Sequence, residues 1–93
     1  MAKEQILFSS EEKTNAQHVS DFLRQLADKI QAGQVILKQA GEEVTADIPP
    51  NLVLEVKLEE EAKKKGTQRS LEVEIEWMVG SEGLPVKSGV SLG

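Results

Sequence analysis

The chain has 93 residues, of which 39% are hydrophobic and 3% aromatic, and its formal charge is −5. This length allows one small domain with a single core, and the acidic balance argues against nonspecific binding to nucleic acid or to an anionic membrane. With zero cysteines, disulfides and thiolate metal sites are excluded.

Apolar runs along the chain are short. The N-terminus lacks the apolar run of a signal peptide, and no run approaches the roughly 18 residues that a membrane span needs. We therefore expect a soluble, cytoplasmic protein.

The first predicted helix is amphipathic and covers residues 15–32, and a short edge strand is predicted before it at residues 5–9. Thr14 and Gln17 have the spacing of a capping box, with a competing box at Ser9 and Glu12. Gly33 suits the left-handed position that follows a helix end. One stripe at three- and four-residue spacing predicts the helix: Ala16, Val19, Phe22, Leu23, Leu26, Ala27 and Ile30.

Three strands are predicted between the helix and residue 59. Residues 34–39 and 43–48 have the pattern of a hairpin around Ala40, Gly41 and Glu42. The Pro49-Pro50-Asn51 segment then predicts a sharp connection. From Leu52 apolar residues alternate again through Leu58, which predicts a third strand.

Residues 59–66 support two interpretations. Glu59, Glu60 and Glu61 each precede a lysine of 63–65 by four residues, which favours a helical turn. The period-two pattern runs into this segment from both sides, and Gly66 suits a turn. A strand to about Glu60 and a charged hairpin tip are preferred over the helical turn.

The last strand, residues 70–78, has the strongest pattern in the chain. Leu71, Val73, Ile75 and Trp77 alternate with three glutamates, as in a strand with one buried face and one wet face. Residues 80–93 lack periodicity and contain four of the seven glycines, which predicts a disordered tail after a single domain of residues 1–79.

These elements predict an α+β fold: an antiparallel meander sheet of four or five strands with the one helix packed on its apolar face. The expected core consists of the inward-facing apolar residues of helix and sheet: Val19, Phe22, Leu23, Leu26, Ile30, Val35, Leu37, Val44, Ala46, Ile48, Leu52, Leu54, Val56, Leu58, Leu71, Val73, Ile75 and Trp77.

The helix end Phe22-Leu23-Arg24-Gln25-Leu26-Ala27-Asp28-Lys29-Ile30-Gln31-Ala32-Gly33 and the strand Leu71-Glu72-Val73-Glu74-Ile75-Glu76-Trp77 together resemble the amphi-Trp domain family. The similarity covers about residues 4–78, and the segment from Pro49 to Val56 also matches in character. The resemblance implies an uncharacterised bacterial or archaeal domain without catalytic residues. The family-marking positions, Gly33, Pro49, Glu74 and Trp77, look architectural.

The wet face of the predicted sheet is acidic. It would present Glu43, Asp47, Glu55, Glu59, Glu72, Glu74 and Glu76 against only Lys38 and Lys57. A solvated face that keeps the sheet soluble explains this most simply. Because like charges opposite one another destabilise a sheet, a docking face for a basic partner is the functional alternative, and phosphate mimicry is a lesser one. The candidate partner-binding face is Glu55, Glu59, Glu72, Glu74 and Glu76.

Other candidate chemistry is weaker. Lys63, Lys64 and Lys65 form the sole basic cluster and could contact phosphate, although the preceding glutamates largely neutralise them. His18 is the only histidine, beside Asp21, and a lone His makes neither a zinc site nor a nucleophile–base pair. We expect it to be an exposed helix residue. Trp77 is expected in the core.

We therefore expect a noncatalytic interaction module without cofactor or metal, binding a protein partner, preferably a basic one, through the acidic face or a free sheet edge. It could also form a homo-oligomer. Two alternatives stay open: a nucleic-acid-associated protein acting through residues 63–65, and a small enzyme using a carboxylate.

Overall fold

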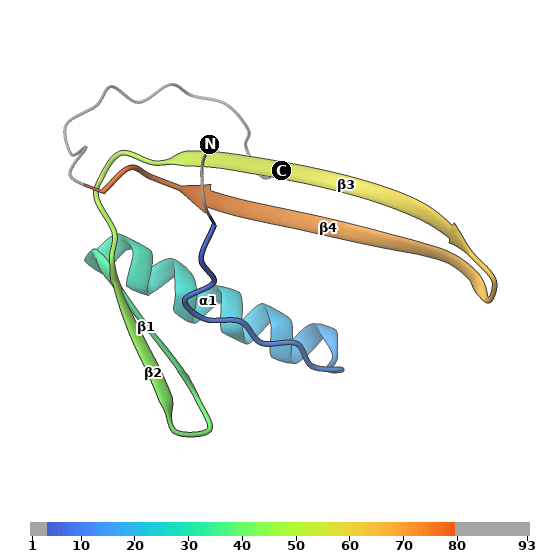
Figure 1. Ribbon diagram of the computed structural model, residues 1–93, viewed down its shortest axis with the longest axis horizontal. Coiled ribbons are helices and arrows are strands. Elements are labelled where there is room, and N and C mark those ends of the chain that lie inside the picture. Colours follow the sequence, from blue (N-terminus) through green and yellow to red (C-terminus); the bar gives the residue numbers. More distant parts are fainter. Residues whose placement is uncertain (1–3, 80–93) are drawn as a thin grey trace. The chain divides into compact units, whose positions relative to one another are not determined.

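The computed structural model describes residues 4–79, which group into two compact units that divide after Ile48. One α-helix and four antiparallel strands confirm the α+β class. The strands form two separate two-stranded sheets, β1–β2 and β3–β4 (Figure 1), so a single meander sheet is not confirmed.

Helix α1 spans Ala16–Ala32, close to the predicted bounds. Its N-cap is Asn15, whose side-chain Oδ1 accepts from the backbone N–H of His18 at 2.9 Å. The predicted Thr14–Gln17 box is therefore wrong, because the extended Asn15 occupies the capping position and Gln17 donates instead to Asp21, at 2.9 Å. Gly33 ends the helix with a φ of 91°, and its N–H reaches the carbonyls of Lys29 and Ile30, as predicted.

Residues 4–15 precede the helix without regular secondary structure. The edge strand predicted at residues 5–9 does not form, and Ile6 and Leu7 are 80% and 67% exposed. Three apolar residues have too little pattern to specify a strand, and no neighbouring strand of the described chain pairs with them.

The first hairpin joins β1 (Gln34–Gln39) to β2 (Glu42–Asp47) in register from Gln34↔Asp47 to Gln39↔Glu42. Its two-residue turn is Ala40-Gly41, and φ is positive at both positions, 38° and 85°. This is the type I′ pattern, whose twist matches that of the flanking strands. The predicted hairpin is confirmed, with a turn one residue shorter than expected.

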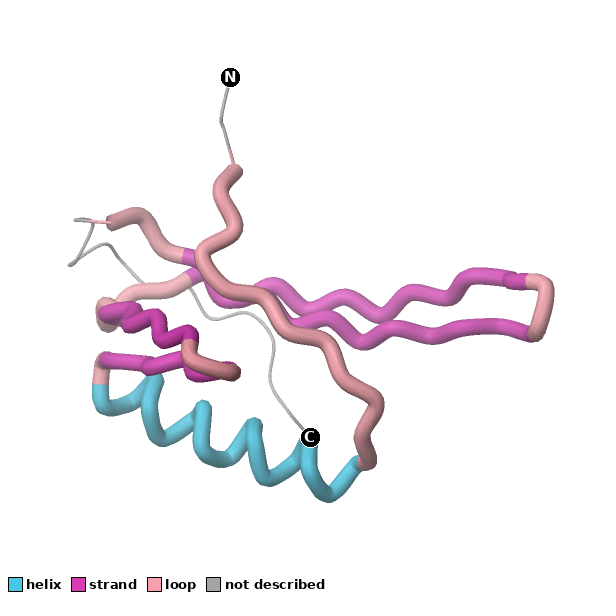
Figure 2. Tube along the Cα trace, turned by 60° about the horizontal axis from the view of Figure 1, so that its bottom comes forward, coloured by secondary structure: helices cyan, strands magenta, loops and turns pink. Residues whose placement is uncertain are grey.

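The unit that contains α1, β1 and β2 has a small core. α1 contacts β1 and the hairpin lies beside it (Figure 2). Val35 is 7% exposed and is the one buried side chain of the described residues. Leu26 and Ile30 of the helix and Leu37 of β1 are half-buried. Packing in this unit is therefore concentrated on the C-terminal half of the helix.

The second hairpin is longer. β3 (Val53–Lys63) and β4 (Gly66–Glu76) pair in register from Val53↔Glu76 to Lys63↔Gly66, and Figure 1 shows them side by side up to a tight turn. Lys64 and Lys65 form that turn. Residues 59–63 are thus strand rather than helix, because each has a cross-strand partner, which outweighs the weak glutamate–lysine spacing signal.

The predicted core is confirmed only in part, because eight of its eighteen members are exposed. All of β3 is exposed, β4 has only Ser70 and Ile75 half-buried, and Val19, Phe22 and Leu23 of α1 are exposed. Trp77, just after β4, is half-buried, while Glu74 is exposed. The physical reason is that a two-stranded hairpin gives its side chains lateral neighbours only, and burial requires a second layer.

No helix in residues 4–79 has the length and apolar character needed to cross a membrane. The tail predicted at residues 80–93 lies outside the described residues. The single-domain assignment of residues 1–79 stays a prediction.

Candidate functional site

The register of the β3–β4 hairpin divides its side chains between two faces. Because directly paired residues share a face and the side-chain period is two, all five glutamates of the predicted partner-binding face lie together. We define the acidic face as the glutamates Glu55, Glu59, Glu61, Glu72, Glu74 and Glu76 with the lysines Lys57 and Lys63. Glu43 and Asp47 belong to β2, in the other sheet, so the predicted acidic surface is divided between two sheets.

Lys57 neutralises the middle of the acidic face. Its Nζ lies 2.8 Å from Oε1 of Glu59 on its own strand and 3.4 Å from Oε2 of its cross-strand partner Glu72. The hydrogen bond and charge of Glu59, followed by those of Glu72, raise the pKa of Lys57 above its ordinary value. Lys63 lies 3.6 Å from Glu61.

At one end of the acidic face repulsion between carboxylates outweighs the attraction of Lys57. Glu55 is paired directly with Glu74, and the carboxylates of Glu55, Glu74 and Glu76 offer oxygens that all lie within 4.8 Å of one another. A side-chain hydrogen bond with Glu76 and repulsion from its charge raise the pKa of Glu74. We call these three residues the carboxylate cluster. It concentrates negative charge at the open end of the hairpin.

The carboxylate cluster is exposed at all three positions. Three oxygen ligands in water are fewer than the six to eight that Ca²⁺ takes in a built site, and an acid–base pair needs burial to separate two pKa values widely. The arrangement is best suited to attracting cationic groups.

The opposite face of the same hairpin is apolar. We define the apolar face by its three cross-strand pairs: Leu54↔Ile75, Val56↔Val73 and Leu58↔Leu71. The next pair, Glu60↔Arg69, forms an ion pair at 2.8 Å on the same face. Sequence reasoning missed this pair, although counting residues in steps of two from Leu58 and Leu71 reaches both positions.

The predicted phosphate-contact lysines occupy the hairpin tip. Lys63 ends β3 and is ion-paired with Glu61, whereas Lys64 and Lys65 form the exposed turn. At 3.4 Å per residue, the tip is about 27 Å from the carboxylate cluster. The lysines of the turn and the carboxylate cluster therefore lie at opposite ends of the hairpin.

Each strand of this hairpin has one edge without a partner strand in the described chain, because β3 and β4 pair only with each other. The free edge of β4 lies next to Glu72, Glu74 and Glu76. Unpaired backbone N–H and C=O groups at such an edge can accept an added strand.

The single histidine is exposed, as expected. Its Nε2 lies 3.1 Å from Oε1 of Glu12, in the segment before the helix, rather than beside Asp21. His18 has no second histidine or cysteine for a zinc site.

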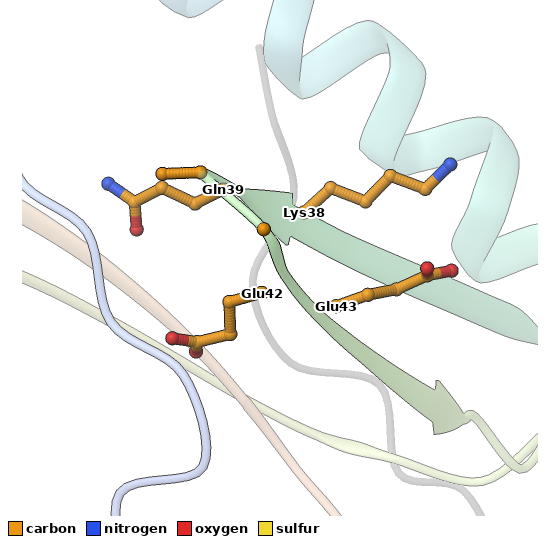
Figure 3. A pocket seen from close by; sticks show the side chains of 6 residues that line it. Lys38, Gln39, Glu42 and Glu43 are labelled. Carbon is orange, nitrogen blue, oxygen red and sulfur yellow. The ribbon is translucent and has the colours of Figure 1, made fainter.

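A shallow hollow lies at the turn of the other hairpin, lined by residues 38–43. Figure 3 shows Lys38 and Glu43 extending to one side of the strands, and Gln39 and Glu42 to the other. These side chains do not converge on a common point, so the hollow offers no organised binding site.

Comparison with curated proteins found no match, and comparison with solved structures found none either. The Amphi-Trp domain family matches residues 1–92. This match agrees with the observed geometry, in which an amphipathic strand of alternating glutamates and apolar residues leads directly to Trp77. The chain belongs to the Amphi-Trp domain family.

Proposed function

We propose that this domain is a noncatalytic interaction module that binds an extended, basic segment of a partner protein along the free edge of β4. The observation that carries this proposal is the coincidence of an unpaired strand edge with Glu72, Glu74 and Glu76 on one face. The partner would add a strand by main-chain hydrogen bonds.

Charge explains why the partner should be basic. Of these three glutamates, Lys57 contacts Glu72, and the carboxylate cluster at Glu74 and Glu76 keeps its mutual repulsion. Lys or Arg at every second position of an added strand would lie beside these carboxylates and relieve the repulsion. Apolar residues at the intervening positions would extend the apolar face.

The test uses a capped decapeptide that alternates Lys with Val, titrated into the full chain by calorimetry. We expect binding at low ionic strength that is lost at about 0.5 M NaCl through screening. Converting Glu72, Glu74 and Glu76 together to Gln should weaken binding roughly tenfold, about 1.4 kcal/mol, since each rim ion pair contributes only about 0–1 kcal/mol.

Two controls separate edge binding from charge alone. The triple variant Glu11→Gln, Glu42→Gln, Glu43→Gln removes the same charge from residues outside the β3–β4 hairpin and should leave binding unchanged. The same peptide with alternate backbone nitrogens methylated keeps its charge but cannot donate ladder hydrogen bonds. Equal affinity of the methylated and unmethylated peptides would contradict strand addition.

A second candidate function is phosphate contact by the hairpin tip, favoured by the exposed Lys64-Lys65 turn at a distance from the carboxylate cluster. A 20-nucleotide single strand added at low salt should then shift the amide resonances of Lys63, Lys64 and Lys65. If those resonances do not move, or if Lys64→Glu with Lys65→Glu binds equally well, this candidate is excluded.

A further inference from the structure

The apolar face of the β3–β4 hairpin is exposed in the described structure. Leu58 and its partner Leu71 are 71% and 70% exposed, and Leu54, Val56 and Val73 are also exposed. An isolated two-stranded hairpin is marginally stable in water, and independent stability needs a layer packed on its hydrophobic side. The apolar face is therefore expected to pack against a second layer.

The charges on the two faces of the hairpin indicate which partner can pack on the apolar face. The acidic face carries six glutamates against two lysines, whereas the apolar face carries one acid and one base, Glu60 and Arg69, joined at 2.8 Å. A second copy of this chain, itself at −5, is repelled by the acidic face. It meets no net charge at the apolar face.

The area is also sufficient. At about 25 cal/mol per Å², the 1.5–3 kcal/mol gained by burying a large aliphatic side chain corresponds to roughly 60–120 Å² each. Six such side chains give on the order of 500 Å² per hairpin, so a pair would bury about 1,000 Å², the lower limit for a specific interface.

We propose that two copies of this chain associate through their apolar faces, forming a two-layered β-sandwich with a twofold axis near the Val56–Val73 pair. Such an interface is isologous, because the same patch serves both copies. The Glu60–Arg69 pair lies at its rim, where the charges stay hydrated. Both acidic faces and both β4 edges remain outward.

The first test is sedimentation equilibrium of the full chain between about 5 and 500 μM. We expect a concentration-dependent mass approaching twice 10.2 kDa. Salt at about 0.5 M should preserve or strengthen the dimer, because it screens repulsion between like-charged copies. Binding of the basic decapeptide responds to salt in the opposite sense, so the two proposals fail separately.

Leu58→Glu should weaken dimerisation by at least about a hundredfold, since it buries an unpaired carboxylate at the interface. The side chain is exposed within one copy, so the hairpin register itself should persist, with Trp77 fluorescence as the check. Dimerisation unchanged in this variant would overturn the proposal.

Two single-cysteine variants test the interface without any change at Leu58. The natural chain has zero cysteines, so any disulfide in a single-cysteine variant joins two chains. Under mild oxidation, Val56→Cys should crosslink rapidly because it lies near the twofold axis, and Lys57→Cys, on the acidic face, should crosslink at least tenfold more slowly. Preferential crosslinking at Lys57→Cys would place the interface elsewhere and refute the proposal. A monomer at all concentrations would mean that the face is covered within one chain, which also refutes it.

Discussion

The turn of the first hairpin gives two substitutions with opposite predicted effects. Ala40 and Gly41 both have positive φ, at 38° and 85°. Gly41→Ala should destabilise the unit of α1, β1 and β2 by about 1 kcal/mol, because a Cβ disfavours this backbone region. A Cβ at Gly41 would meet nothing within 4 Å, so the whole effect comes from the backbone.

Ala40 already carries that backbone cost. Ala40→Asn should therefore stabilise the unit by about 0.5–1 kcal/mol, since Asn tolerates the left-handed region and Asn-Gly is the favoured type I′ pair. Ala40→Gly should gain less, because glycine also increases the entropy of the unfolded chain.

Urea denaturation followed by circular dichroism at 222 nm reports on this unit, which contains α1. With a slope of about 1 kcal/mol per M for so small a protein, Gly41→Ala should lower the midpoint by about 1 M and Ala40→Asn should raise it by about 0.5–1 M. If Gly41→Ala leaves the midpoint unchanged, or if Ala40→Asn lowers it, the type I′ assignment is wrong.

Three further predictions follow from named contacts. Asn15→Ala should lower the free energy of unfolding by about 1 kcal/mol through loss of the helix cap, measured by urea denaturation, whereas Thr14→Ala should change it little. Val35→Ala should cost about 1.5–2.5 kcal/mol in the same assay, since it removes two buried methyl groups and leaves a cavity. The pKa of Glu74, followed by NMR of its carboxyl carbon, should lie above the ordinary value of a glutamate, and Glu76→Gln should lower it. The pKa of Glu74 is raised in the folded hairpin, so protonation of Glu74 stabilises the hairpin. This stabilisation is complete at pH values below the pKa of the unfolded state. That contribution is lost as pH rises through the raised pKa, so Trp77 fluorescence should report a more stable hairpin on acidification towards pH 4.5.

Much of the local structure was predictable from patterns a few residues long. The stripe from Ala16 to Ile30 and the Gly33 stop give α1 nearly residue for residue, since helix ends depend on local capping and φ preferences. The cap itself was misassigned, because Thr14 and Asn15 are both capable capping residues and adjacent in the chain. Only the backbone conformation distinguishes them.

The candidate site was partly predictable. Alternation places Glu72, Glu74 and Glu76 on one face, and this needs no structure. The contacts of Lys57 with Glu59 and Glu72, and the direct opposition of Glu55 and Glu74, depend on the register between β3 and β4. Register follows from where the turn falls, and the sequence alone left residues 59–66 open between a helical turn and a hairpin tip.

By itself, the sequence of this Amphi-Trp domain determined its family, its element types and the division of the last strand into an acidic and an apolar side. The tertiary structure alone decided that the two hairpins form separate sheets, that Glu60 forms an ion pair with Arg69, and that Leu58 and Leu71 are exposed. The physical reason is that alternation along one strand records which side chains share a face, whereas pairing and burial depend on residues distant in the chain.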